Sequence, residues 1–144
     1  MTSELKKYYL KLIAPAIALF LIYGASEIFH FQDFTKLKSP DFFPVLFFVL
    51  SSISAIAGPL FLRTIFAHKM RNKNMVKSEY FIKFEKGLIS ISMLTPFFCF
   101  IAIVCEFDKF YAASIVLLMF YAIYYYFPSQ KRIDFDKKIF RVNE

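Results

Sequence analysis

Four long apolar runs constrain this chain more than any other feature of its sequence. Their approximate bounds are residues 9–31, 42–67, 84–105 and 110–127. Each run is close to the ~20 residues that an α-helix needs to cross a bilayer. Backbone N–H and C=O groups cannot stay unpaired in hydrocarbon, so each run is predicted to be helical. With 58% hydrophobic residues and a mean hydropathy of +0.52, the chain is predicted to be an all-α integral membrane protein.

The distribution of Lys and Arg predicts how the runs thread through the membrane. Of the 18 Lys and Arg residues, 15 lie at the N-terminus, around the second connection or in the C-terminal tail, and the other three lie in the first and third connections. Lys and Arg are retained on the cytoplasmic side during insertion. We therefore expect an antiparallel four-helix bundle in the inner (cytoplasmic) membrane, with both termini cytoplasmic. This placement explains the net charge of +7 without a nucleic-acid partner.

The chain is expected to form a single membrane domain, residues 1–144, with a basic cytoplasmic loop at 68–83 and a basic tail at 128–144. The tail sequence RIDFDKKIFRV mixes two periodicities: a helix would align Phe135 with Ile139, and a strand would align Phe135 with Ile133. Either form is expected to lie on the membrane surface or to dock on a partner.

Small residues one turn apart mark two candidate faces for packing or for binding a partner. They are Ala14 and Ala18 in the first run, and Ser54 and Gly58 in the second. Small-xxx-small faces allow helix backbones to approach closely in a membrane.

Groups that could perform chemistry are sparse. Glu27 and His30 lie three residues apart near the outer end of the first run, so we consider them a candidate outer polar site. A Glu-x-x-His pair occurs in di-iron helix bundles, but those need two copies and two further carboxylates. We predict no catalytic residue, cofactor or metal. The central parts of the four runs lack Asp, Glu, Lys and Arg, which disfavours a small oligomeric transporter, since proton- and ion-coupled carriers usually place such residues there.

The basic loop and its flanks form a third candidate region. Its candidate residues are Arg63, Lys69, Arg71, Lys73, Asn74 and Glu79. Three of them, Arg71, Asn74 and Glu79, together with Tyr80 resemble an Arg/Asn/Glu-Tyr cluster in small four-helix membrane enzymes of eicosanoid and glutathione metabolism. In those enzymes the cluster follows the first helix and the Asn-to-Glu spacing differs, so no catalytic role is carried over. The alternative is a solvated hairpin that contacts anionic lipid.

A second resemblance covers the organisation of the whole chain. A short, basic, Phe-, Tyr-, Lys- and Ile-rich chain that opens with ELKKYYLKLI and crosses the membrane several times is similar to inner-membrane immunity proteins of pore-forming bacteriocins. This resemblance implies helix-to-helix recognition of a toxin hairpin in the bilayer. We expect a non-catalytic protein whose partners are membrane lipid and another integral membrane protein or a membrane-inserted toxin. An accessory subunit of a membrane complex, a membrane enzyme with a lipophilic substrate and a small transporter remain as alternatives.

Overall fold

The computed structural model describes residues 1–28, 40–71 and 75–142 of the chain, without the side chain of Glu27. The helices are α1 (Thr2–Ile28), α2 (Phe43–Ser52), the π-helical turn η1 (Ile53–Ala57), α3 (Gly58–Met70), α4 (Ser78–Ser92), α5 (Thr95–Val104), α6 (Lys109–Tyr125) and α7 (Gln130–Phe140). No β-strand forms within these ranges, although Val76 and Val142 make one isolated bridge. The prediction of an all-helical chain is therefore confirmed.

Three helical segments are long and apolar enough to cross a membrane: Thr2–Ser26, Phe43–Met70 and Ser78–Val104. Helices α6 and α7 together form a fourth candidate, but the chain bends by 75° between them. The structure thus agrees with a multi-pass membrane protein that has three apolar spans, or four if the bent pair is counted. The number of crossings and the cytoplasmic position of both termini remain predictions.

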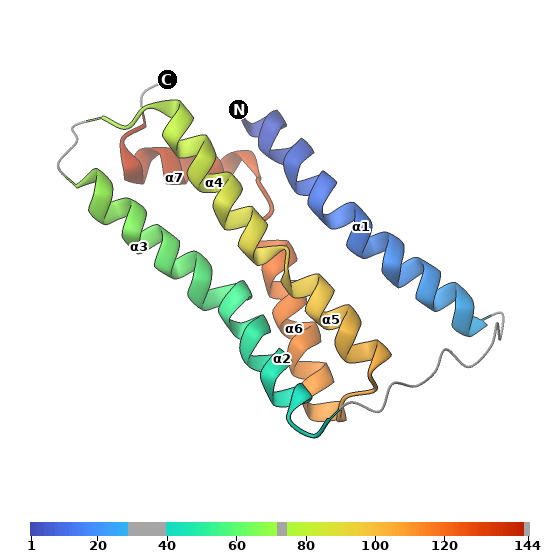
Figure 1. Ribbon diagram of the computed structural model, residues 1–144. Helices are drawn as coiled ribbons and strands as arrows, with labels where there is room; N and C mark the ends of the chain where they lie inside the picture. The colour runs from blue at the N-terminus through green and yellow to red at the C-terminus, as the bar shows by residue number, and fades with distance from the viewer. Residues whose placement is uncertain (29–39, 72–74, 143–144) are drawn as a thin grey trace.

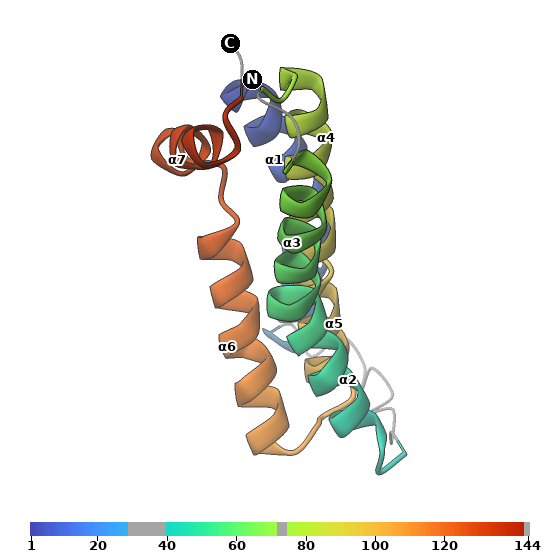
Figure 2. The same ribbon diagram turned by 90° about the vertical axis from the view of Figure 1, so that its left-hand side faces the viewer.

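The long segments lie side by side (Figure 1). The continuous α4–α5 segment is central, with α1 packed on one side and α2–α3 on the other. Helix α6 packs on α2 and α5 in a second layer, and α7 lies across the top of that layer (Figure 2). Figure 1 also shows both termini at the end of the molecule where α3 finishes and α4 begins.

Two prolines explain the breaks within the long segments. Pro59 lacks an N–H, and the chain before it forms the wide turn η1 in which the Gly58 N–H bonds to the Ile53 carbonyl. Pro96 similarly follows a turn at 93–94 that separates α4 from α5. Close to both breaks, the hydroxyls of Ser54 and Thr95 bond at 2.8 Å and join the two segments inside the core.

The helices extend further into the charged parts of the chain than hydropathy alone indicates. Helix α1 begins at Thr2 rather than near residue 9. The basic connection covers 71–77, instead of the predicted 68–83, because α4 begins at Ser78. The predicted tail at 128–144 contains α7, which is folded onto the rest of the chain. These segments are amphipathic, so one face is buried although their average composition is polar.

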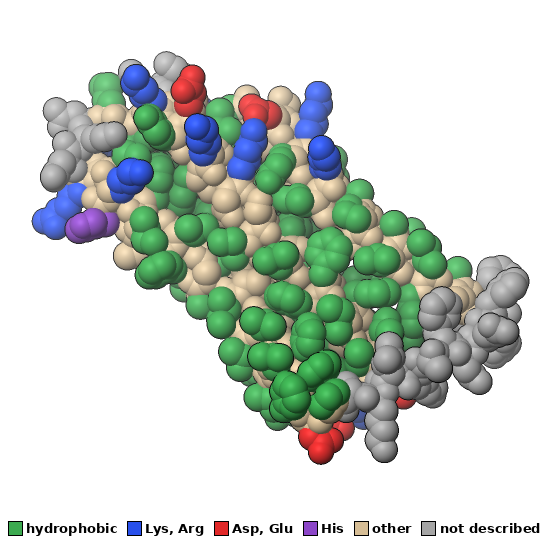
Figure 3. All heavy atoms as spheres, viewed as in Figure 1, with side chains coloured by type: hydrophobic (Ala, Val, Ile, Leu, Met, Phe, Trp, Pro, Cys, Tyr) green, Lys and Arg blue, Asp and Glu red, His purple; other side chains and the backbone are tan. Residues whose placement is uncertain are grey.

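Charged side chains gather at the two ends of the molecule, as Figure 3 shows for one face. Blue Lys and Arg side chains, with a few red Asp and Glu side chains among them, lie at the end that carries the termini; red side chains also appear at the opposite tip, and apolar side chains cover the region between the two ends. This is the surface expected of helices that cross a bilayer and meet water at their ends.

Candidate functional site: an ion-paired cluster beneath helix α7

Helix α7 is attached to the other helices by both apolar and polar contacts. The Ser129 hydroxyl caps its first turn by accepting a hydrogen bond from the Arg132 N–H at 3.3 Å. Ile133 is completely buried. At the far end, the Phe140 ring packs edge-on against Phe66 and Phe84, with ring centroids 5.1 Å and 5.5 Å away. The tail is therefore part of the core at this end of the molecule.

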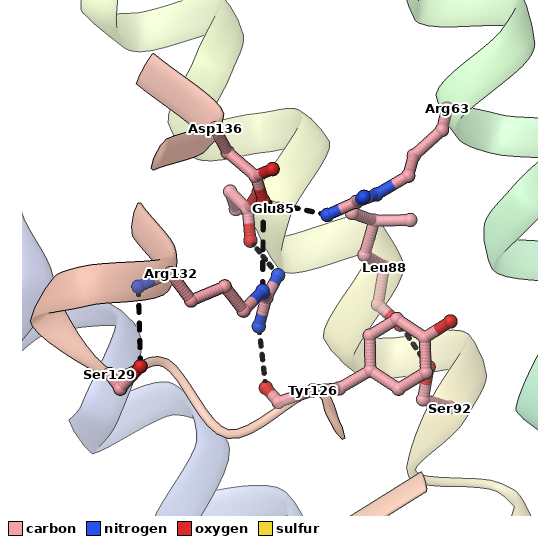
Figure 4. Close-up of polar contacts among 8 residues, drawn as sticks. All are labelled: Arg63, Glu85, Leu88, Ser92, Tyr126, Ser129, Arg132 and Asp136. Carbon is pink, nitrogen blue, oxygen red and sulfur yellow. Dashed lines mark hydrogen bonds and ion pairs between the residues drawn. The ribbon is translucent and has the colours of Figure 1, made fainter. Parts of the chain in front are cut away.

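Four charged side chains meet beneath α7 (Figure 4). Arg63 of α3 donates a hydrogen bond from Nη2 to the Asp136 carboxylate at 2.7 Å. Arg132 of α7 donates from its own Nη2 to Glu85 of α4. Arg132 also donates to the Tyr126 carbonyl at 2.8 Å, and its Nε lies 3.6 Å from Asp136. The two arginines and two carboxylates thus connect α7 to the consecutive helices α3 and α4.

Burial makes this ionic cluster different from a surface salt bridge. The Glu85 and Asp136 side chains are 0% and 1% exposed, and those of Arg132 and Arg63 are 13% and 25% exposed. Removing charges from water costs several kcal/mol for each ion, so such groups are tolerated only when they are paired. The two positive and two negative charges balance. In the ionic cluster, Glu85 Oε1 and the Nε atoms of Arg63 and Arg132 are buried without a hydrogen-bond partner.

A cleft of about 600 Å³ opens beside the ionic cluster. Its lining comes from both arms of the α6–α7 bend and from α1 and α3. The residues that line it are Tyr9, Arg63, Phe120, Ile123, Tyr124, Tyr125, Phe127, Ser129, Arg132, Phe135 and Asp136. The cleft therefore combines aromatic walls with two guanidinium groups and one carboxylate.

The structure separates the two predicted small-residue faces. Ser54 is buried and hydrogen-bonded to Thr95, and a Cβ on Gly58 would come within 2.9 Å of the Ile91 side chain. This face is used for packing inside the chain. In contrast, Ala14 and Ala18 are exposed on α1, so their face is not covered by the described part of the chain.

The candidate residues of the basic loop do not form one site. Arg63 belongs to the ionic cluster, whereas Lys69, Arg71 and Glu79 are exposed. The ion pairs between described residues include neither Arg71 nor Glu79. Lys73 and Asn74 lie outside the described residues, so the predicted cluster of Arg71, Asn74 and Glu79 is not assembled by what the structure describes.

The predicted outer polar site consists of Glu27 and His30. His30 and the Glu27 side chain lie outside the part of the chain that the structure describes. Within that part, no group of three or more His, Cys, Asp and Glu side chains is arranged to hold a metal ion.

Sequence reasoning missed three of the four residues in the ionic cluster: Glu85, Arg132 and Asp136. A signal was present in the helical spacing. Phe81, Glu85 and Leu88 share one face of α4, and Ile133, Asp136 and Phe140 share one face of α7. A carboxylate on the apolar face of an amphipathic helix indicates a buried charge that needs a partner.

Comparisons with models of known families, with characterised proteins and with solved structures find no match for this chain.

Proposed function

We propose that the chain is a non-catalytic, multi-pass membrane protein that acts by binding a helix of another membrane-embedded protein. The exposed Ala14 and Ala18 face of α1 carries this proposal. Two arginines and two carboxylates are paired with each other inside the fold, so they hold the helices together. Along the apolar spans, the surface that remains available to bind another protein consists of exposed helix faces.

The outward face of α1 has the chemistry that a partner helix needs. Leu10, Ala14, Ile17, Ala18 and Leu21 recur at helical spacing, and the three larger side chains are 58%, 49% and 68% exposed. Small residues on such a face let a second backbone approach closely, and the larger residues beside them supply packing. Within the described residues, helix α1 packs on α4 and α5 through its other face, which includes the buried Ile13 and Ala16.

Two kinds of partner fit this mode of binding. The resemblance to immunity proteins favours a helical hairpin that a pore-forming toxin inserts into the membrane. The accessory-subunit version replaces the toxin with a resident membrane protein. Both versions require the same face of α1. The first version is supported if the chain protects cells from a pore-forming toxin and loses this protection when the α1 face is altered.

Site-specific photocrosslinking tests the proposal. A crosslinker at Ala18 is expected to capture a membrane protein, and one at Ala113, an exposed alanine on α6, serves as the control. The captured protein is then identified, purified and titrated with the purified chain in nanodiscs. We expect Ala14→Leu combined with Ala18→Leu to weaken binding at least tenfold, and Ala113→Leu to leave it unchanged.

Equal crosslinking from both positions would contradict the proposed contact, and so would unaltered binding by the double Leu variant. Circular dichroism of the double variant serves as the folding control. If the variant keeps its secondary structure, a loss of binding is not caused by unfolding. This control is informative because neither alanine is covered by the described part of the chain.

A further inference from the structure

The cleft in the α6–α7 bend is shaped for an amphipathic molecule. Its volume of about 600 Å³ lies within the ~300–1,000 Å³ typical of ligand sites. Phe120, Tyr124 and Phe135 line it and are 60%, 87% and 62% exposed, so its walls are open to the surroundings of the helices. Large aromatic side chains in such positions offer apolar contact with a chain-like ligand.

The floor of the cleft carries charged groups of the ionic cluster, whose two positive and two negative charges balance overall. Arg63 and Arg132 line it together with one carboxylate, that of Asp136, whereas Glu85 lies behind the lining. Arg63 bonds to Asp136 through Nη2 alone, its side chain is 25% exposed, and its Nη1 makes no hydrogen bond to the described residues. A guanidinium with free donors is well suited to the planar, paired recognition of a phosphate group.

The position of the cleft indicates where the ligand comes from. It lies at the end of α6 that is next to α7, where Tyr121, Tyr124 and Tyr125 gather. Lys and Arg side chains cluster at this end of the molecule (Figure 3). Tyrosine is enriched at the level of lipid headgroups, and anionic headgroups are attracted to basic protein segments.

We propose that this cleft binds one anionic phospholipid, with its phosphate at Arg63 and Arg132 and its acyl chains along the aromatic wall of α6. The lipid phosphate accepts a hydrogen bond from the Arg63 Nη1, and the acyl chains cover Phe120 and Tyr124. Helix α7 lies above the headgroup and adds Phe135 to the wall. The bound lipid then stabilises the α6–α7 bend, because it contacts both arms.

Matched variants on α7 test this inference. The protein in a neutral detergent is titrated with phosphatidylglycerol, phosphatidylcholine and inorganic phosphate, and bound lipid is counted by native mass spectrometry. We expect phosphatidylglycerol to bind about tenfold more tightly than phosphatidylcholine. Phe135→Glu places a negative charge in the cleft and is expected to weaken phosphatidylglycerol binding about tenfold. Ile139→Glu adds the same charge on α7, 53% exposed but outside the cleft lining, and is expected to leave binding unchanged.

Three outcomes would overturn the inference. The first is equal affinity for the two lipids, and the second is an equal loss of phosphatidylglycerol affinity in the Phe135→Glu and Ile139→Glu variants. The third is displacement of the lipid by millimolar inorganic phosphate, which would indicate that the site binds a soluble anion. If Phe135→Glu fails to fold, Tyr124→Glu gives the same test from the α6 wall, since Tyr124 is 87% exposed. The result does not depend on the partner of α1.

Discussion

Removing one charge from the ionic cluster should destabilise the protein far more than removing both members of a pair. Arg132→Met keeps the length of the side chain but leaves the Glu85 and Asp136 carboxylates with only Arg63. Glu85→Gln leaves two guanidinium groups with one carboxylate. The double variant keeps Arg63 and Asp136, which are hydrogen-bonded at 2.7 Å, and so restores a neutral cluster.

The burial of the cluster sets the expected magnitude. Glu85 is 0% exposed and Arg132 is 13% exposed, so Arg132→Met leaves a carboxylate that water cannot solvate. Breaking a buried pair by removing one partner costs about 3–5 kcal/mol. Glu85→Gln is expected to cost less, because Arg132 keeps the Tyr126 carbonyl and nearby Asp136. We expect the double variant to be more stable than Arg132→Met alone, although it has lost more contacts.

Thiol labelling in mixed micelles measures these differences in stability at two buried positions of the chain. Ile133→Cys, in a background without the two native cysteines, reports undocking of α7, because Ile133 is completely buried. The native Cys99, with Cys105→Ser, is buried in the other apolar core and reports global unfolding. Each 1.4 kcal/mol changes the open population about tenfold, so Arg132→Met should accelerate labelling at position 133 by about 10²- to 4 × 10³-fold.

An exposed ion pair provides the control for this experiment. Lys86 and Glu4 are 2.5 Å apart, but their side chains are 33% and 53% exposed. Solvent screens such a pair, so Lys86→Met is expected to leave labelling at position 133 nearly unchanged. Strictly additive losses for Arg132→Met and Glu85→Gln would refute the reasoning, since they would mean that the two charges do not stabilise each other.

Two further predictions concern packing and topology. Gly58→Ala should destabilise the protein by about 1–3 kcal/mol, because the new Cβ would lie 2.9 Å from Ile91, whereas Gly24→Ala, with no atom within 4 Å, should be neutral or stabilising in thermal unfolding. Met75→Cys and Asp108→Cys should lie on opposite sides of the membrane: in intact cells an impermeant maleimide is expected to label only the cysteine at 108. Labelling of both, or a stable Gly58→Ala protein, would contradict these predictions.

The helical segments were predictable from sequence because hydropathy and length are local properties. Phe43–Met70 and Ser78–Val104 match the predicted runs 42–67 and 84–105 to within one residue at their apolar ends, and the structure extends both into charged sequence at the other end. The extensions were missed because a run of high average hydropathy does not detect an amphipathic turn. The part of α4 that begins at Ser78 buries Phe81 and Phe84 while exposing Lys83, so its average composition is that of a polar loop.

The ionic cluster was harder to predict because its members come from distant parts of the chain. Arg63 was identified as a candidate from its place beside the basic loop, but its partner Asp136 is 73 residues away. Glu85 and Arg132 are 47 residues apart. Helical periodicity assigns each carboxylate to a buried face, yet it does not specify which face of another helix will cover it.

By itself, the sequence determined that the chain forms long apolar helices with cationic residues concentrated near their ends. Those properties follow from hydrogen bonding and hydrophobicity within each segment. Only the tertiary structure decided that Ser54 and Gly58 pack inside while Ala14 and Ala18, which have the same spacing, face outward. Periodicity identifies a face of a helix, but the neighbour of that face is chosen by how all the helices fit together.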